Sequence, residues 1–189
     1  MTETPDRRTR RWEATHRRIF TTALALFEEL GYEEVSVNQI AGQADVSVPT
    51  FYAHYPSKEH LIMALPTREQ IEALLAGAPA ELPIGERLRR ALPPFVAQLP
   101  PDVREDTRAR WRIIAATPAL RTRAAEFERT TAGMLLESVA SSSGEDPLPA
   151  DVVQTGAVLV AYTTALLGWA DGNNERRLED VVAEALGAL

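Results

Sequence analysis

The sequence of 189 residues contains no cysteine, a single lysine and only three histidines. Without cysteine the chain forms neither disulfides nor cysteine-ligated zinc sites, and this composition suits a reducing cytoplasm. The histidines, His16, His54 and His60, form no pair at a metal-binding spacing. A glycine-rich phosphate loop and a Ser/His/Asp arrangement are also missing. We therefore expect no enzyme and no cofactor or metal site.

Long apolar runs and strand patterns are scarce as well. The first 18 residues carry no apolar segment behind their arginines, so we expect no secretory signal. The longest apolar stretch, residues 152–170, is interrupted by Gln154 and Tyr162 and falls short of a membrane span; we interpret it as a buried helix of a soluble protein. Since no sustained alternation of apolar and polar residues occurs, we predict an all-α fold.

The net charge of −7 is unevenly distributed along the chain. Residues 7–18 hold six arginines and one carboxylate, whereas 18 carboxylates face 13 arginines beyond residue 64. A small basic contact zone can coexist with an acidic body. The acidic total therefore does not exclude a partner of negative charge.

Residues 19–65 carry short helical patterns separated by stop and cap signals. These signals are Gly31, the capping box Ser36–Gln39, Ser47 with Pro49 behind it, and Ser57. Three short helices with a tight turn at residues 43–46 form the helix-turn-helix pattern. In such a unit the second helix supports the third, whose N-terminal half enters the major groove of DNA.

The same segment closely resembles the DNA-binding domain of the tetracycline-repressor (TetR) family. The resemblance rests on Phe27, Leu30-Gly31-Tyr32, Val35, Val37, Ile40-Ala41, Ala44, Val46-Ser47, Phe51-Tyr52, Tyr55-Pro56, Ser57-Lys58-Glu59 and Leu61. It implies three parts: residues 1–18 as a basic N-terminal arm with the start of the first helix, 19–65 as the helix-turn-helix domain, and 66–189 as the ligand-binding and dimerisation domain.

The resemblance also implies which residues contact DNA. Those expected to face bases are Val48, Pro49, Thr50, Ala53 and His54, and those expected to touch phosphates are Ser36, Tyr52 and Lys58. Residues 47–55 contain no arginine or lysine, so a bidentate arginine contact to guanine is not expected from this helix. The arginines Arg8, Arg10 and Arg11 add phosphate or minor-groove contacts in our interpretation. We expect this arm to be disordered without DNA, with a solubilising tail as the alternative. We expect Tyr55 to be a core aromatic residue; for Tyr52 a core role is an equal alternative, and for His54 a surface role is the alternative.

Beyond residue 66, proline pairs such as Pro93-Pro94 separate longer helical patterns, and two helices near 150–171 and 175–188 close the chain. By resemblance, the last two long helices form the interface of a homodimer, as a four-helix bundle across a two-fold axis. The residues expected there are Val152, Gly156, Leu159, Thr163, Leu178, Val182 and Leu186.

The middle helices resemble, less specifically, the acyl-CoA-like ligand-binding branch of the family. Apolar residues that would line a pocket are Phe95, Trp111, Ile114, Phe127, Met134, Tyr162, Leu166 and Trp169, although each is also a candidate for plain core. Arg104, Arg108 and Arg112 recur at four-residue spacing and would suit a phosphate-bearing ligand. A solvated face paired with nearby carboxylates is the alternative.

The sequence thus predicts a DNA-binding transcriptional regulator. On the family's grounds, it would be a repressor released from a near-palindromic operator by a small apolar, acyl-CoA-like effector. An all-helical ligand-binding or small catalytic bundle without DNA binding is the second hypothesis.

Overall fold

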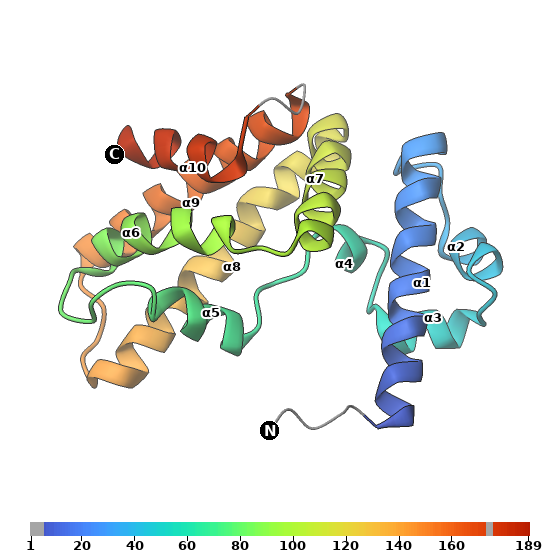
Figure 1. Cartoon of the computed structure of the whole chain (residues 1–189), viewed down its shortest axis with the longest axis horizontal. Coiled ribbons are helices and arrows are strands. Elements are labelled where there is room, and N and C mark those ends of the chain that lie inside the picture. The colour runs from blue at the N-terminus through green and yellow to red at the C-terminus, as the bar shows by residue number, and fades with distance from the viewer. Residues whose placement is uncertain (1–5, 173–175) are drawn as a thin grey trace. The chain divides into compact units, whose positions relative to one another are not determined.

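The structure, a computed structural model, describes residues 6–172 and 176–189, and this part of the chain contains ten helices and no strand (Figure 1). The helices are α1 Arg7–Leu30, α2 Val37–Gln43, α3 Val48–His54, α4 Glu59–Ile62, α5 Arg68–Leu75, α6 Ile84–Ala97, α7 Pro101–Ala116, α8 Pro118–Ser143, α9 Pro149–Asp171 and α10 Leu178–Gly187. The all-α prediction is confirmed. The chain divides into two compact units, residues 1–64 and 65–189.

The predicted caps set the bounds of the helices in the first unit. The Ser36 hydroxyl accepts a hydrogen bond from the backbone N–H of Gln39, and the Gln39 side chain accepts one from the Ser36 N–H at 2.8 Å, which completes the capping box. Ser47 caps α3 by accepting from the N–H of Thr50 at 3.1 Å. Gly31 ends α1 with a φ of 88°, a value that glycine adopts without steric cost. The helix-turn-helix predicted from these signals is therefore present.

The tight turn between α2 and α3 places a non-glycine residue in the left-handed region. Asp45 has a φ of 50°, and its N–H donates to the Gly42 carbonyl at 3.2 Å. Aspartate tolerates this conformation better than most residues. Arg18 of α1 reaches the Asp45 carbonyl at 3.4 Å, so the long first helix also holds the turn.

Two expectations about helix bounds are wrong. Pro93 and Pro94 lie inside α6 instead of separating two helices. Each proline leaves the carbonyl four residues earlier without its helical donor, and those carbonyls belong to Arg89 and Arg90, which are exposed, so that water can satisfy them. Ser57 does not cap α4 either; its hydroxyl bonds the His60 ring nitrogen at 2.8 Å.

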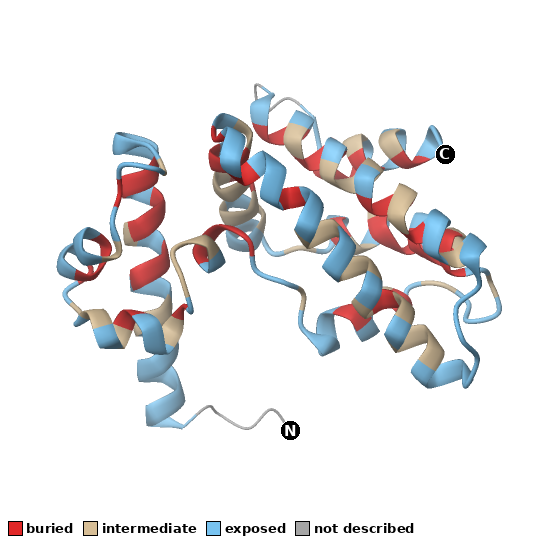
Figure 2. Ribbon diagram, turned by 180° about the vertical axis from the view of Figure 1, so that it is seen from behind, coloured by how far each residue is buried: buried red, intermediate tan, exposed pale blue. Residues whose placement is uncertain are grey.

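The second unit is built around α9, which packs against α6, α7, α8 and α10. Figure 2 marks the buried segments of these helices in red. The largest fully buried side chains of this core include Leu88, Val96, Leu135, Val158 and Leu178. By length and composition alone α9 could cross a membrane, but the core helix of a water-soluble protein has the same properties. Its place in this packed unit identifies it as a core helix.

The apolar stripe of α10 lies in the same core, and this corrects part of the predicted dimer interface. Leu178, Val182 and Leu186 are at most 3% exposed, and Leu159 of α9 is also buried. These side chains are covered within one chain, so they do not face a second subunit. Glu175, the expected start of this last helix, lies outside the described residues.

The first turn of α6 crosses α9 at very short range. A Cβ added to Gly85 would lie 2.6 Å from Oε1 and 2.7 Å from Cβ of Gln154, closer than real Cβ atoms approach other heavy atoms. Because the Gln154 Cβ is fixed to the α9 backbone, it cannot move away without shifting the helix. Only glycine fits this crossing.

We expect Gly85→Ala to lower the free energy of unfolding by about 1–3 kcal/mol, the usual cost of overpacking a tight site. Gly133→Ala in α8 is the matched control, because an added Cβ there meets no heavy atom within 4 Å. That control should raise stability by up to about 1 kcal/mol through helix propensity. Urea titrations at equal protein concentration measure both values, and equal effects of the two substitutions would contradict the close crossing.

A buried carboxylate joins three segments of the second unit. Glu179 accepts hydrogen bonds from Arg104 at 2.8 Å and from Arg177. Arg104 also donates to the carbonyls of Val96 and Ala97, both at 3.1 Å. Burial pushes the pKa of Glu179 upward, but the hydrogen bonds from Arg104, its own backbone and Arg177 outweigh burial and bring the pKa down to about 2.

The lowered pKa makes this contribution to stability sensitive to acid. The carboxylate stabilises the fold fully above its ordinary pKa of 4.5, and the effect is lost as the pH falls toward 2. We expect Glu179→Gln to reduce the free energy of unfolding by about 2–3 kcal/mol at pH 7. In denaturant titrations the difference from the wild type should close between about pH 4.5 and 2, and a difference independent of pH would refute this role.

Candidate nucleic-acid interface

The outer face of α3 is exposed at three residues and half-buried at Val48 and Thr50. Pro49, Tyr52 and Ala53 are exposed and Val48 is half-buried, whereas Phe51 is completely buried beneath them. A helix with one anchoring aromatic residue on its inner face presents the residues between its turns outward. The structure therefore places four of the five residues expected to face bases, Thr50 among them, where a partner can reach them.

Thr50 already takes part in a hydrogen bond inside the helix. Its hydroxyl lies 2.7 Å from the Ser47 hydroxyl, and either group can be the donor. A hydroxyl has one donor and two acceptor positions, so Thr50 keeps capacity for a second partner. The bond with Ser47 restricts the position of the Thr50 hydroxyl oxygen.

His54 does not share this outer face, which corrects the expectation that it faces bases. Its ring packs against Trp12 at 4.7 Å and His16 at 5.6 Å between centroids, both in α1. Its Nδ1 is enclosed and has no hydrogen-bond partner in the described part of the chain, and burial lowers its pKa. The cause is packing at the C-terminal end of α3, where the rings of Trp12 and His16 lie against the His54 ring.

Lys58 is likewise turned inward, away from the phosphate contact expected of it. Its ammonium group donates to the carbonyls of Tyr32 at 2.7 Å and Val35 at 2.8 Å, and it lies 4.2 Å from the centre of the Tyr32 ring. Burial lowers its pKa, while Glu33 and Glu34 oppose that effect. Lys58 thus holds the loop between α1 and α2.

Tyr52 and Ser36 remain candidates for phosphate contacts. Tyr52 is 52% exposed and meets the Phe51 ring edge-on at 5.5 Å, so it is not a core residue. Ser36 is exposed at the start of α2. Tyr55, in contrast, is buried and donates its hydroxyl to the His16 carbonyl at 3.2 Å.

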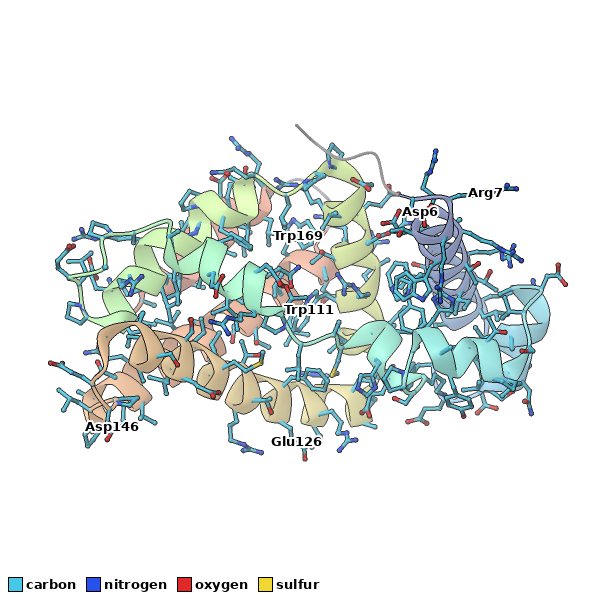
Figure 3. The ribbon with its side chains drawn as sticks, turned by 90° about the horizontal axis from the view of Figure 1, so that it is seen from below. Asp6, Arg7, Trp111, Glu126, Asp146 and Trp169 are labelled. Carbon is cyan, nitrogen blue, oxygen red and sulfur yellow. The ribbon has the colours of Figure 1, made fainter. Side chains whose placement is uncertain are left out.

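The arginines near the N-terminus belong to α1, which corrects the expectation of a disordered arm. Arg8, Arg10 and Arg11 are helical and exposed, and Figure 3 shows the neighbouring Arg7 pointing away from the helix. Residues 1–5 lie outside the described part of the chain. A regular helix cannot follow the minor groove as an extended arm does, so these side chains suit phosphate contacts better.

This basic helix start is unfavourable in the isolated protein. The N-terminal end of a helix carries a partial positive charge. The first turn of α1 contains no acidic residue, and the N-cap residue Asp6 makes no side-chain capping hydrogen bond. Four arginines at positions 7, 8, 10 and 11 add further repulsion. Positive side chains at the positive end of a helix lower its stability, and such locally unfavourable arrangements are common where a surface binds a partner. The positive charge here favours an anionic partner.

The sequence did not predict the ring contacts that join α1 to the C-terminal end of α3. The Trp12 ring stacks on His16 at 4.8 Å, and His16 stacks on Tyr55 at 4.2 Å. Burial and the charge of His54 both lower the pKa of His16. The signal was the four-residue spacing of Trp12 and His16, which places both rings on one face of α1.

In the second unit, most of the expected pocket residues belong to the core. Ile114, Leu166 and Trp169 are buried, and the partly buried side chains packed against the same core include Phe95, Trp111, Met134 and Tyr162. Figure 3 shows Trp111 and Trp169 among the helices of this unit. Phe127 of α8 is partly exposed and lies apart from that group. Burial raises the pKa of Tyr162 to about 12, which keeps its phenol neutral.

The predicted arginine row is split among different partners. Arg104 forms an ion pair with Glu179. The Nε atom of Arg112 donates a hydrogen bond to the Ala170 carbonyl at the end of α9, at 3.4 Å. Arg108 between them is buried, and its guanidinium carbon lies 4.2 Å from the centre of the Trp169 ring. The row is therefore neither one cluster nor a solvated face.

Comparison with known proteins covers both units. Residues 19–65 match the family described as bacterial regulatory proteins of the tetR family, and residues 82–189 match the MftR C-terminal domain. The repressor KstR of Rhodococcus jostii is 43% identical over 53 residues, which make up 28% of this chain and 25% of KstR. The chain thus matches about a quarter of the length of such curated relatives.

Solved structures with the same fold include two regulators. The fatty acid degradation regulator FadR of Bacillus halodurans has a TM-score of 0.54 at 17% identity and covers 92% of this chain and 93% of its own. SmeT, the repressor of a multidrug efflux pump of Stenotrophomonas maltophilia, also has a TM-score of 0.54, at 16% identity, over 90% of this chain and 86% of its own. At these identities the likeness concerns the fold. With a helix-turn-helix at its start and an MftR-type domain over more than half of its length, the chain belongs to the TetR family of DNA-binding bacterial regulatory proteins.

Proposed function

We propose that this protein is a cytoplasmic transcriptional repressor. In this proposal it binds a near-palindromic operator as a homodimer and leaves it when a small apolar effector binds the second unit. The observation that carries the DNA-binding part is the exposed outer face of α3, with Pro49, Tyr52 and Ala53, in the same unit as exposed arginines at the start of α1. Family membership favours this regulator over a ligand-binding or catalytic bundle without DNA binding.

Sequence preference would come from few direct contacts. Since α3 carries no arginine or lysine, Thr50 supplies the hydrogen bonds to bases, and Val48 and Pro49 supply apolar contacts to thymine methyl groups. The shape of the DNA adds specificity at base pairs that the protein does not touch. Half-sites would be spaced by about one helical turn of DNA, ~34 Å, or a multiple of it.

The dimer interface that we propose is the exposed apolar face of α9. Val152, Val153 and Val160 are 51%, 72% and 54% exposed, and Gly156 and Thr163 lie close to them along the helix. The Thr164 hydroxyl donates to the Val160 carbonyl within the helix, which reduces the polarity of this face further. Exposed apolar surface on a core helix is typical of a subunit interface.

Release from DNA would follow from two geometries of this dimer. An effector shifts the balance only as far as its affinities for the two geometries differ. In this proposal an acyl-CoA-like effector binds among the apolar side chains around Trp111 and Tyr162, which pack against the core of the second unit.

The arginines of α1 should account for part of the salt dependence of DNA binding. We expect replacement of Arg8, Arg10 and Arg11 by glutamine to reduce the slope of log affinity against log salt by about 0.9 for each phosphate that the variant no longer neutralises. Fluorescence anisotropy with a duplex from the protein's own upstream region and with a scrambled duplex measures this slope.

Replacement of Arg89, Arg121 and Arg129 by glutamine is the matched control, since these three arginines are exposed on the second unit. The control should leave the slope unchanged. Equal slopes for both triple variants would remove the arginines of α1 from the interface. If the affinity of the wild type for the duplex does not change with salt concentration, the protein does not bind the DNA through its phosphates, and the DNA-binding proposal fails.

The proposed interface predicts the effect of charges on α9. We expect Val153→Asp combined with Val160→Asp to give a folded monomer in sedimentation and to weaken operator binding about 100-fold or more, because the two half-sites are then no longer bound by one linked pair. Val103→Asp, at an exposed valine of α7, is the control and should keep the dimer. A dimer that survives both changes on α9 would place the interface elsewhere.

A further inference from the structure

Arg108 is a buried cation whose N–H groups find no acceptor in the described part of the chain. It is 8% exposed, and none of these groups donates to any of the described residues. Its Nε and Nη1 atoms are fully enclosed. Arg87, which is also buried, differs because it donates to the Leu75 carbonyl at 2.9 Å.

No carboxylate among the described residues compensates for the charge of Arg108. Burial lowers its pKa most, and the like charge of Arg112 lowers it further. Glu179, the buried carboxylate of this unit, is bonded to Arg104 and Arg177 instead. Buried charges in proteins are normally paired, and an unpaired one costs stability. The fold thus maintains an unfavourable group where an apolar residue would pack better.

The surroundings of Arg108 identify what would pair with it. The Trp169 ring covers one face of the guanidinium, which leaves the N–H groups at its edges for acceptors. Trp169 itself is held in place, since its indole N–H donates to the Arg176 carbonyl at 3.2 Å. A planar guanidinium stacked in this way binds carboxylate or phosphate oxygens through charge-assisted hydrogen bonds.

Further polar groups share the face of α9 that carries Trp169. Thr155, Tyr162 and Trp169 recur every seven residues, so they lie along one side of the helix. The Thr155 hydroxyl is also enclosed, with no hydrogen-bond partner among residues 6–172 and 176–189. A few polar groups within an otherwise apolar interior are the usual composition of a ligand site.

We propose that Arg108 binds the anionic head group of the effector, whose remainder is an apolar chain. This inference rests on the proposed function, in which the second unit binds an effector. The head group is a carboxylate or a phosphate, as in a fatty acid or an acyl-CoA thioester. Its oxygens bond the edges of the guanidinium, while the apolar chain lies among the core side chains.

Arg108→Met tests this site with three probes of equal chain length: dodecanoate, dodecanoyl-CoA and the neutral dodecanol, each below its micelle-forming concentration. For the wild type we expect thermal stabilisation by at least one of the two anions, because a ligand that binds only the folded state raises its stability. In the variant the affinity for that anion should fall about 10-fold or more. Which anion stabilises the wild type identifies the source of the head group.

The stability of the ligand-free variant separates binding from a structural role. If the arginine is kept for a ligand, Arg108→Met should melt at the same temperature as the wild type or higher, since an uncompensated charge has been removed. A structural role predicts a lower melting temperature. Arg108→Lys, which keeps the charge but not the planar fork, should bind the anion more weakly than the wild type and more tightly than Arg108→Met. Arg89→Met, on the exposed side of α6, is the control and should change neither property.

The outcomes distinguish this inference from the proposed function. If dodecanol stabilises the wild type as well as the anions do, the effector is apolar but uncharged, and only the role of Arg108 is refuted. If neither anion binds, or if Arg108→Met melts lower and keeps wild-type affinity, the inference is overturned. DNA binding, measured separately by anisotropy without ligand, should be unchanged in Arg108→Met; its absence from the wild type would refute the proposed function itself.

Discussion

The burial of Phe51 is the contact on which the first unit depends. With no exposed surface, this side chain fixes the rotation of α3, and helical periodicity then decides the direction of every other residue in it. His54 and Tyr55 turn inward onto His16, whereas Pro49 and Ala53 turn outward. A helix of seven residues has little stability of its own, so this anchoring is what gives α3 a defined outer face.

Local signals in the sequence were enough to predict the helix-turn-helix. The hydroxyls of Ser36 and Ser47 and the positive φ of Gly31 act within a few residues, so the sequence around them determines their role. Lys58 shows the limit of such reasoning. Its partners are carbonyls more than 20 residues away, and only the packing of the chain brings them within reach.

The dimer residues illustrate the same limit in another way. An apolar stripe at helical spacing indicates that one face of a helix is buried. It does not indicate whether the same chain or a second subunit covers that face. Val182 fits the pattern and lies in the core of its own chain, whereas Val153, on the long apolar helix α9, is 72% exposed. The distinction depends on which side of α9 the neighbouring helices occupy, and this is a property of the three-dimensional packing.

The two faces of α9 suggest how a regulator of this kind transmits a signal. One face carries the exposed valines that we assign to the second subunit, and the opposite side carries Trp169, which touches Arg108 of α7. An anion bound at Arg108 neutralises the repulsion from Arg112, whose own side chain reaches the last turn of α9 at the Ala170 carbonyl. The bound state would therefore favour a different position of α7 against the end of α9. Because packed helices move as rigid elements, such a shift would reach the subunit interface without a change in any residue that lies there.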